Sequence, residues 1–521
     1  MKKLTLTREC LRNPQDWPKD YRLPNFDIDT MIKRTKDAPI WLHIGAGNIF
    51  RIFVAGLQQD LLESGQADKG IIVYESYDEG IIPASYTPYD NLTLAVSLNA
   101  DGSVGKRVIA SIADVFHMDL PRLMQTIAQP SLQIISFTIT EKGYAVPLEN
   151  ICLSPDTAKT AMEQVTAGLF ARFQAGGPPL ALVTMDNFAE NGTVVARAVE
   201  AIATAWHTRN HTPAAFIEYV KSQSYPWTMI DKITPMPSKT VADILAKDGY
   251  ASTQITETAK HTTVASFVNA ESPQYLVIED CFPNGRPPLE KTVGKGVFFT
   301  NRDTVRKADQ MKVCACLNPL HTILGVCGAL FNYPTISSCM QDRRLVGFIK
   351  ESADEAMSVV ADPGIINPHE FLHEVVTQRF PNPFIPDTTA RINMDASQKI
   401  SIRFGETLKS RLAAGLDTDE LKAIPLFIAL WLRFRMGIDD NGAAMALSPD
   451  PKVPEAVLSL LEMKLGESAD LRPILSNKEI FGLDLCTAIP KLAAKVENLF
   501  QMLSEKPGVV NKYLTACYGE K

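Results

Sequence analysis

Three polar side chains with complementary chemistry lie close together in one segment: Lys312, Asn318 and His321, within KVCACLNPLHT. Oxidising an alcohol without a metal requires a base for the hydroxyl proton and donors that stabilise the alkoxide-like oxygen while hydride leaves the carbon. A lysine, an amide and an imidazole can supply these groups, provided that burial or nearby positive charge lowers the pKa of a lysine that acts as base. The alternative is a surface lysine followed by two ordinary polar groups near a helix start.

Other polar residues are suited to binding a substrate. Asp186 and Asn187 directly follow the apolar run ALVTM, and ligands of open α/β sheets lie beyond the carboxyl ends of strands, so we expect Asn187 to donate to a substrate. Asp231, in MIDKITPMPS, is either a second substrate group or a turn former. Arg391 and Lys399 are eight residues apart. On one helix face they can bind an anion or several hydroxyls, and a solvated basic face is the alternative.

A turn with two glycines, GAGNIFR, connects an apolar run to a helical pattern. Glycines at such a junction let the backbone approach a pyrophosphate, which then rests on the helix N-terminus. Phe50 stands where a third glycine is usual, and a tight turn that binds nothing is the alternative. Glu75 ends the next strand pattern. An acid there accepts hydrogen bonds from the ribose of NAD and repels the extra phosphate of NADP; the alternative is an exposed loop acid. The expected cofactor is NAD, and the expected cofactor-binding residues are Gly45, Gly47, Asn48, Ile49, Arg51 and Glu75.

Two patterns resemble metal sites. HEFLH, from His369 to His373, fits the HExxH of zinc peptidases, and Cys314, Cys316 and His321 carry soft ligands. No third-ligand signature follows HEFLH, and the prolines of RFPNPFIPD end its helix. The C-x-C pair lacks the usual partners, and cysteine is also a common buried residue. We therefore expect no metal site.

Short apolar runs alternate with helical patterns in the first half of the chain. Residues 39–44, 70–74, 132–140 and 180–185 predict buried strands, and residues 49–63 and 156–173 predict helices, the first with Gly65 at its C-cap. Residues 92–98 and 104–109 flank NADGS and predict a β-hairpin. Such alternation is typical of a mostly parallel sheet with helices on both faces.

The domain organisation follows from where these patterns begin and end. The first forty residues are polar and contain prolines, which predicts an irregular lead-in, and residues 275–278 predict the last strand. Helical patterns dominate from about residue 303. The predicted fold class is therefore α/β: a Rossmann-like N-terminal domain with a mostly parallel sheet, residues 1–299, plus an all-α C-terminal domain, residues 300–521.

Composition excludes several classes of function. The chain has 521 residues, a net charge of −7 and 45% hydrophobic residues, which argues against a nucleic-acid partner and against wholesale disorder. No apolar stretch follows the N-terminal lysines, and the most apolar segment, residues 424–432, is too short to span a membrane. Nine cysteines without an export signal favour reduced thiols in a cytoplasmic protein.

Seven blocks in sequence order, from about residue 40 to 405, resemble the polyol-specific long-chain dehydrogenase/reductase (mannitol dehydrogenase) family. They are GAGNIFR, TITEKGY, MDNFAENG, MIDKITP, VIEDCFPNGRP, LNPLH and RFPNPFIPDTTARINMDASQK. The resemblance implies an enzyme with a Rossmann-like domain, a helical domain, no metal and a small sugar acid or polyol as substrate.

The same resemblance implies roles for single residues. Lys312 corresponds to the general base, and Asn187 and Asn318 correspond to the oxyanion donors. The groups that bind or orient the substrate correspond to His321, Arg391, Lys399 and Asp231.

One spacing differs from the family pattern. The family has four residues between the lysine and the asparagine, whereas five residues separate Lys312 from Asn318 here. In a continuous helix the extra residue would turn Lys312 by about 100°. Either a local irregularity absorbs this residue, or another group is the base.

LNPLHT is most similar to the family members that interconvert mannonate and fructuronate, which is therefore the expected reaction. Tagaturonate reduction, mannitol 2-dehydrogenation and a nicotinamide-binding sensor without turnover are the alternatives. A sensor needs no base, so the lysine–asparagine–histidine set argues against it.

Overall fold

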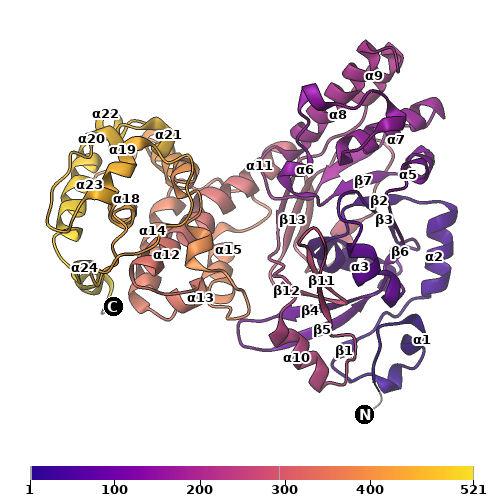
Figure 1. Ribbon diagram of the computed structural model, residues 1–521, viewed down its shortest axis with the longest axis horizontal. Coiled ribbons are helices and arrows are strands. Elements are labelled where there is room, and N and C mark those ends of the chain that lie inside the picture. Colours follow the sequence, from indigo (N-terminus) through magenta and orange to yellow (C-terminus); the bar gives the residue numbers. More distant parts are fainter. Residues whose placement is uncertain (1–2, 293, 520–521) are drawn as a thin grey trace. The chain divides into compact units, whose positions relative to one another are not determined.

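The chain forms two compact units (Figure 1), and the computed structural model describes residues 3–292 and 294–519. The first unit comprises Met1–Asn99 and Ser103–Arg306, and the second comprises Lys307–Lys521 together with Ala100–Gly102. The first unit contains the named strands and the second is helical, which confirms the expected fold class.

A five-stranded sheet ordered β6-β3-β2-β7-β8 lies at the centre of the first unit. Its strands are β2 (Trp41–Ile44), β3 (Ile71–Glu75), β6 (Ile112–His117), β7 (Ile134–Phe137) and β8 (Ala181–Thr184). Every neighbouring pair is parallel. The strand order reverses beside β2, because the chain adds β3 on one side of it and β7 on the other. Sheets of this kind bind ligands at the carboxyl ends of the strands next to such a reversal.

Helices cover both faces of this sheet, and successive strand residues point to opposite faces. Val73 packs in one hydrophobic cluster with residues of α3, whereas its neighbours Ile72 and Tyr74 pack in another with residues of α5, α7 and α8. These helices are α3 (Ala55–Glu63), α5 (Leu120–Ala128), α7 (Ala161–Gln174) and α8 (Asn191–Thr208).

The helices predicted for residues 49–63 and 156–173 are both present, but the first turn of each differs from a regular α-helix that starts at the predicted residue. A π-helical turn, Phe50–Val54, precedes α3, and Gly65 follows that helix with a φ of 70°, as expected of a C-cap glycine. The helix α7 begins later than residue 156, because Thr160 and Glu163 form a capping box at its start.

Three smaller sheets complete the first unit. The predicted hairpin is present: β4 (Thr93–Leu98) and β5 (Val104–Ile109) pair antiparallel. They join β1 (Tyr21–Arg22) and β12 (Phe267–Glu271) in one sheet. Another sheet contains β9 (Thr228–Asp231), β13 (Tyr275–Glu279) and β14 (Val297–Thr300), and the third is the hairpin β10 (Ile255–Glu257) and β11 (Thr263–Ala265). The predicted strand at residues 275–278 is β13, and a further strand, β14, follows it without a clear pattern in the sequence.

The N-terminal residues are more regular than predicted. A ten-residue helix, α2 (Ile28–Asp37), begins at Asp27, whose carboxylate accepts a hydrogen bond from the backbone N–H of Thr30. Residues of β1 pair with β5. The polar composition concealed α2 because only Met31 and Thr35 of this helix are buried. The remaining helices of the first unit are α1 (Arg8–Leu11), α4 (Ile81–Ser85), α6 (Thr140–Gly143), α9 (Ala214–Lys221) and α10 (Lys239–Lys247). The helix α11 (Arg302–Gln310) begins in the first unit and ends in the second.

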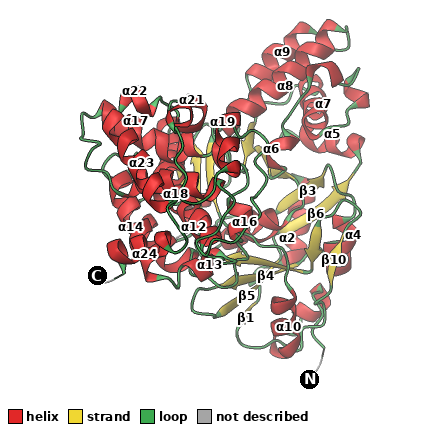
Figure 2. Cartoon of the chain, turned by 60° about the vertical axis from the view of Figure 1, so that its left-hand side comes forward, coloured by secondary structure: helices red, strands yellow, loops and turns green. Residues whose placement is uncertain are grey.

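The second unit is helical, and none of its described residues belongs to a named strand (Figure 2). Its central helix is α18 (Ala423–Arg435), in which every residue is buried. This helix contains the apolar residues 424–432, so that stretch forms core. Its longer companions are α12 (Asn318–Leu330), α14 (Arg343–Met357), α17 (Glu406–Ala413), α23 (Pro490–Leu503) and α24 (Val509–Tyr518). The short helices are α13 (Ile336–Cys339), α15 (Pro368–Glu374), α16 (Thr389–Ile392), α19 (Glu455–Leu458), α20 (Arg472–Leu475), α21 (Lys478–Phe481) and α22 (Leu485–Ala488).

One continuous helix, Arg302–Leu330, passes through α11, a π-helical turn and α12. Its 29 residues are long and apolar enough to meet the length and composition of a membrane span. However, the most apolar part of this helix is mostly buried within the protein. Burial of this extent is typical of a core helix.

Candidate active site

The GAGN turn follows β2 at the point where the strand order reverses. Gly45 has a φ of 107°, and a Cβ at this position would lie 2.5 Å from the carbonyl oxygen of Thr138, which follows β7. Only glycine fits this conformation and this close approach without strain. The backbone N–H of Gly45 also donates to the carbonyl of Tyr74 at 2.8 Å. The first glycine therefore lets three strand ends meet.

Gly47 and Asn48 both leave room for a ligand. Gly47 borders open space, and a side-chain oxygen of Asn48 lacks a hydrogen-bond partner. A Cβ on Gly47 would meet no atom within 4 Å. The side-chain oxygen Oδ1 of Asn48 is buried and has no hydrogen-bond partner, and Ile49 next to it is half-buried at the start of the π-helical turn. Buried polar atoms are normally hydrogen-bonded. The open space at Gly47 thus fits a group that approaches its backbone closely, as a pyrophosphate does.

Glu75 is a buried acid, not an exposed loop acid, since its relative exposure is 5%. Its Oε2 accepts a hydrogen bond from Ala46 N at 2.7 Å, and its Oε1 accepts from Tyr77 N at 2.7 Å and Asp78 N at 3.0 Å. The carboxylate therefore joins the glycine turn to the loop after β3. A carboxylate has about four acceptor sites, so these three amides leave little capacity for a ribose.

Arg51 requires a correction. We expected it to bind the cofactor, but the side chain has a relative exposure of 0%. Its guanidinium donates to Thr93 Oγ1 at 3.1 Å and to Ser85 O at 3.2 Å, and lies 5.2 Å from the ring centroid of Tyr86. The Tyr86 hydroxyl in turn donates to Ala46 O at 2.9 Å. Arg51 therefore supports the glycine turn from inside the protein.

Asp186 and Asn187 lie at the carboxyl end of β8, as expected. Asn187 is exposed. Asp186 accepts hydrogen bonds from Ile139 N at 2.8 Å and from the Tyr144 hydroxyl at 2.6 Å, and burial raises the pKa of its carboxyl. It thereby ties the TITEKGY segment, which follows β7, to the segment that carries Asn187.

Sequence reasoning missed Asn191, whose side chain links the MDNFAENG block to Thr228, the residue directly before MIDKITP. Its Nδ2 donates to Asp186 O at 3.1 Å and to Thr228 Oγ1 at 2.9 Å, and its Oδ1 accepts from Thr228 N at 3.0 Å. Asp231 ends the same strand, β9, and has a relative exposure of 8%. It is therefore a buried strand residue, and the turn-former interpretation was wrong.

Lys312 lies in a π-helical turn, Met311–Cys316, between α11 and α12. The turn contains the wider hydrogen bond from Leu317 N to Lys312 O, at 3.1 Å. A π turn inserts one residue into an α-helix, and such turns are frequent at functional sites. The extra residue between Lys312 and Asn318 is thus absorbed locally. The Lys312 side chain is 1% exposed. Burial raises the pKa of Asp309, one helical turn earlier, and the positive charge of Lys312 opposes the rise.

Asn318 and His321 lie in the first turn of α12. The His321 side chain is 13% exposed, and its Nε2 lies 3.4 Å from Asp387 Oδ2. The pair is not aligned as a hydrogen bond, since this nitrogen has no hydrogen-bond partner. Burial lowers the pKa of His321, and Asp387 opposes the shift without cancelling it. The lowered pKa favours the neutral imidazole, with Asp387 beside its Nε2.

Arg391 and Lys399 do not share a helix face, which corrects our expectation. Arg391 lies in the four-residue α16, whereas Lys399 follows a separate turn that begins at Asp395, whose φ is 52°. Arg391 pairs with Asp387, and the Lys399 ammonium donates to the carbonyl of Met394. Burial lowers the pKa of Lys399, and nearby arginines lower it further.

Arg403 is a third cation that sequence reasoning missed. Its guanidinium donates to Thr322 Oγ1 and, at 3.4 Å, to the carbonyl of Asn318. Burial lowers the pKa of Arg403 to about 10. Its backbone N–H donates to Lys399 O at 3.0 Å, so the π-helical turn Ser401–Gly405 brings Arg403 against the start of α12. Arg403 lies outside the seven blocks that resemble the family, so nothing in the sequence indicated that it contacts the candidate site.

The residues of the metal-like patterns lie on helical segments of the second unit. The HEFLH histidines, His369 and His373, are exposed on α15. Burial raises the pKa of Cys314 and Cys316 to about 12, as expected of inert thiols. Within residues 3–292 and 294–519 no group of three or more metal-ligating side chains is assembled. Metal independence stays a prediction.

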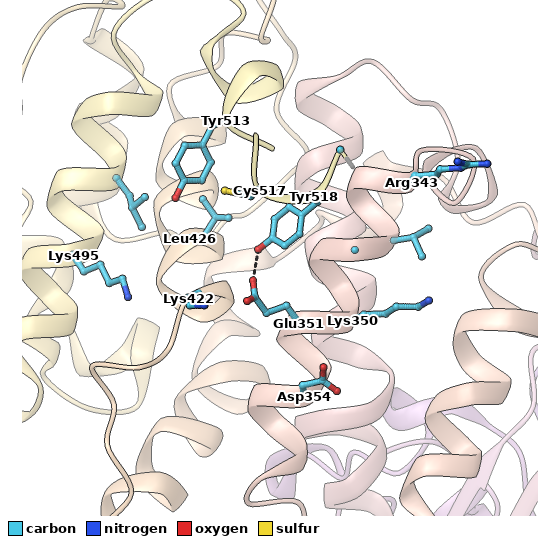
Figure 3. A pocket seen from close by; sticks show the side chains of 14 residues that line it. Arg343, Lys350, Glu351, Asp354, Lys422, Leu426, Lys495, Tyr513, Cys517 and Tyr518 are labelled. Carbon is cyan, nitrogen blue, oxygen red and sulfur yellow. Dashed lines mark hydrogen bonds between the residues drawn. The ribbon is translucent and has the colours of Figure 1, made fainter. Parts of the chain in front are cut away.

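A cavity of about 980 Å³ lies elsewhere in the second unit, among α14, α18, α23 and α24 (Figure 3). Arg343, Lys350, Lys422 and Lys495 line it together with acidic and aromatic side chains. The Tyr518 hydroxyl donates to Glu351 Oε2 at 2.6 Å across its wall. None of the candidate catalytic or binding residues lines this cavity.

The glycine turn at the reversal of a parallel sheet and the lysine–asparagine–histidine set of a helical unit define a two-domain dehydrogenase of the Rossmann class. Residues 39–291 match the mannitol dehydrogenase Rossmann domain, and residues 304–504 match the mannitol dehydrogenase C-terminal domain. The chain belongs to the mannitol dehydrogenase family and is an oxidoreductase.

Relatives extend over nearly the whole chain. A D-mannonate oxidoreductase of Thermotoga maritima is 44% identical and covers 99% of this chain and 100% of its own length. A polyol:NADP oxidoreductase of Gluconobacter oxydans is 28% identical, covering 96% of this chain and 98% of its own. The crystal structure of a D-sorbitol dehydrogenase superposes with a TM-score of 0.79 at 24% identity, covering 98% of this chain and 100% of that one, and shows the shared fold.

Proposed function

We propose that this protein interconverts D-mannonate and D-fructuronate by hydride transfer to and from NAD. The observation that carries the sugar-acid part is a set of three neighbouring cations. Burial and the charges of Arg403 and Arg391 lower the pKa of Lys399, and the same two charges act on His321. The 44% identity to a D-mannonate oxidoreductase over the full chain supports the same choice.

The cations favour a carboxylate over a neutral hydroxyl. Arg391 already has Asp387 as its partner, but both acceptors of the Arg403 guanidinium are neutral oxygens. A buried guanidinium gains most from an ionised acceptor, because charge-assisted hydrogen bonds are roughly twice as strong as neutral ones. A uronate supplies such an acceptor, whereas fructose does not.

The residues around the glycine turn fit a dinucleotide. Gly47 leaves space for a pyrophosphate, and the orphaned Oδ1 of Asn48 provides an acceptor. When bound, the nicotinamide ring accepts or supplies the hydride. We propose NAD over NADP because the buried Glu75 carboxylate at the end of β3 would repel a 2′-phosphate.

The remaining roles follow the family resemblance. Lys312 takes the hydroxyl proton during oxidation and returns it during reduction. Asn187 and Asn318 donate to the alkoxide-like oxygen, and the neutral His321 donates to or accepts from a substrate hydroxyl. Arg391, Lys399 and Asp231 orient the substrate. The alternatives within the family are tagaturonate reduction and mannitol 2-dehydrogenation.

Specificity constants for fructuronate, tagaturonate and fructose, each with NADH, test the proposal. We expect fructuronate to be preferred. Arg403→Gln should weaken fructuronate use at least about tenfold while changing any residual fructose use much less, because the lost interaction is with a carboxylate. Arg472→Gln, on the short helix α20 of the same unit, is the matched control and should change neither value. Equal or better use of fructose would refute the sugar-acid assignment, and no oxidation of NADH with any ketone would favour the sensor.

A further inference from the structure

An exposed tyrosine lies just past the carboxyl end of β3. Tyr77 has a relative exposure of 67%, whereas Glu75, two residues earlier, is buried. The two residues are joined by the hydrogen bond from Tyr77 N to Glu75 Oε1 at 2.7 Å. The aromatic ring therefore projects into solvent from a loop whose backbone is held by the same carboxylate that contacts the glycine turn.

The hairpin of β10 and β11 holds this loop from the other side. Thr258 Oγ1 donates to Asp78 Oδ2 at 2.6 Å, and the Lys260 ammonium donates to the carbonyl of Tyr77. The same ammonium lies 4.3 Å from the centroid of the Tyr77 ring. Two contacts from residues about 180 positions away in sequence thus hold the loop that carries the exposed aromatic ring. The cation–π contact adds a weak attraction between these two exposed side chains.

The order of groups in a dinucleotide predicts what this ring meets. The pyrophosphate rests on the glycine turn after β2, and the adenosine ribose lies beside the acid that ends the next strand. If the adenosine continues in the same direction, its base reaches the loop after β3, which carries Tyr77. Since three backbone amides already occupy Glu75, the ribose gains little from its carboxylate. Binding of the adenosine half then requires another contact.

We propose that Tyr77, held by Lys260 from the hairpin, is the platform on which the adenine of the cofactor stacks. Adenine offers a π-face to an exposed aromatic ring, and such stacking needs no hydrogen-bond recognition. The inference rests on the proposed function, because it takes the glycine turn to bind the pyrophosphate of a dinucleotide.

Calorimetric titration with ADP-ribose tests the platform without turnover, since ADP-ribose contains the adenine but no nicotinamide. Tyr77→Ala should weaken its binding about 5-fold to 150-fold, the range for the loss of one base stack. Tyr77→Phe keeps the ring and should bind within about twofold of the wild type. Leu153→Ala removes another side chain of 67% exposure from the same unit and is the control.

The outcomes separate the two proposals. Wild-type affinity of Tyr77→Ala for ADP-ribose, in an unmodified protein that does bind it, overturns the platform alone. If the wild type binds neither ADP-ribose nor NADH, the dinucleotide site itself is refuted. An equal loss in Tyr77→Ala and Tyr77→Phe also contradicts stacking, because the ring is retained in the second variant.

Discussion

Three glycine-to-alanine substitutions test why the turn after β2 contains glycines. They separate the need for an unusual backbone conformation from the need for space beside the proposed pyrophosphate. Gly45→Ala puts a Cβ 2.5 Å from the Thr138 carbonyl oxygen and forces a side chain to adopt a φ of 107°. Strained backbone costs about 1–3 kcal/mol, and a forced contact with rigid backbone costs about the same again. The sum, about 2–6 kcal/mol, should lower the Tm by about 4–12 °C for a unit of this size.

Gly47→Ala meets neither obstacle, since its backbone is ordinary and no atom lies within 4 Å of the added Cβ. The Tm should stay within about 1 °C of the wild type. The methyl group would, however, project into the space where we propose that the pyrophosphate approaches. An overpacking cost of about 1–3 kcal/mol corresponds to about a 5-fold to 150-fold loss of NADH affinity.

Gly65→Ala is the control for backbone strain alone. Gly65 has a φ of 70° and no atom within 4 Å of an added Cβ, and it lies at the far end of α3 from the turn. It should lose about 1–2 kcal/mol of stability and no cofactor affinity. Thermal unfolding and fluorescence titration with NADH measure both quantities. A Gly45→Ala variant as stable as the wild type would refute the close approach to Thr138. Undiminished NADH affinity in Gly47→Ala would refute the pyrophosphate site.

The other predictions concern the second unit. Lys312→Ala should lower kcat by at least about 100-fold with unchanged NADH affinity, and near-normal turnover would locate the base elsewhere. Activity should survive prolonged chelation, and His373→Ala should leave kcat unchanged, whereas stoichiometric zinc whose removal abolishes activity would contradict the lack of a metal. Burial holds the pKa of His321 below its ordinary 6.5, so below that pH the unfolded chain binds a proton that the native protein does not. The free energy of unfolding should therefore decrease on acidification below pH 6.5, and His321→Gln should make this decrease shallower in denaturant titrations; an unchanged slope would mean that His321 titrates normally.

Local sequence patterns were sufficient to predict most strands of the central sheet in the first unit. Buried apolar runs are properties of a few consecutive residues, so β2, β3, β7 and β8 of the central sheet and the hairpin around NADGS were predicted within three residues of their bounds. The edge strand β6 (Ile112–His117) of the same sheet was missed. The mostly polar helix α2 was missed, because only Met31 and Thr35 are buried in it. Hydrophobic periodicity carries little signal when a helix buries so small a face.

The chemistry of the candidate residues depended on contacts that no local pattern contains. The sequence alone determined which segments carry the glycine turn, the acid after β3 and the lysine–asparagine–histidine set. Only the tertiary structure decided that three amides occupy Glu75, that Arg51 is buried behind the turn, and that a π turn absorbs the residue added after Lys312. It also brought Arg403 to Asn318, 85 positions away. Burial and charge are sums over neighbours from distant parts of the chain, so they exist only once the chain has folded.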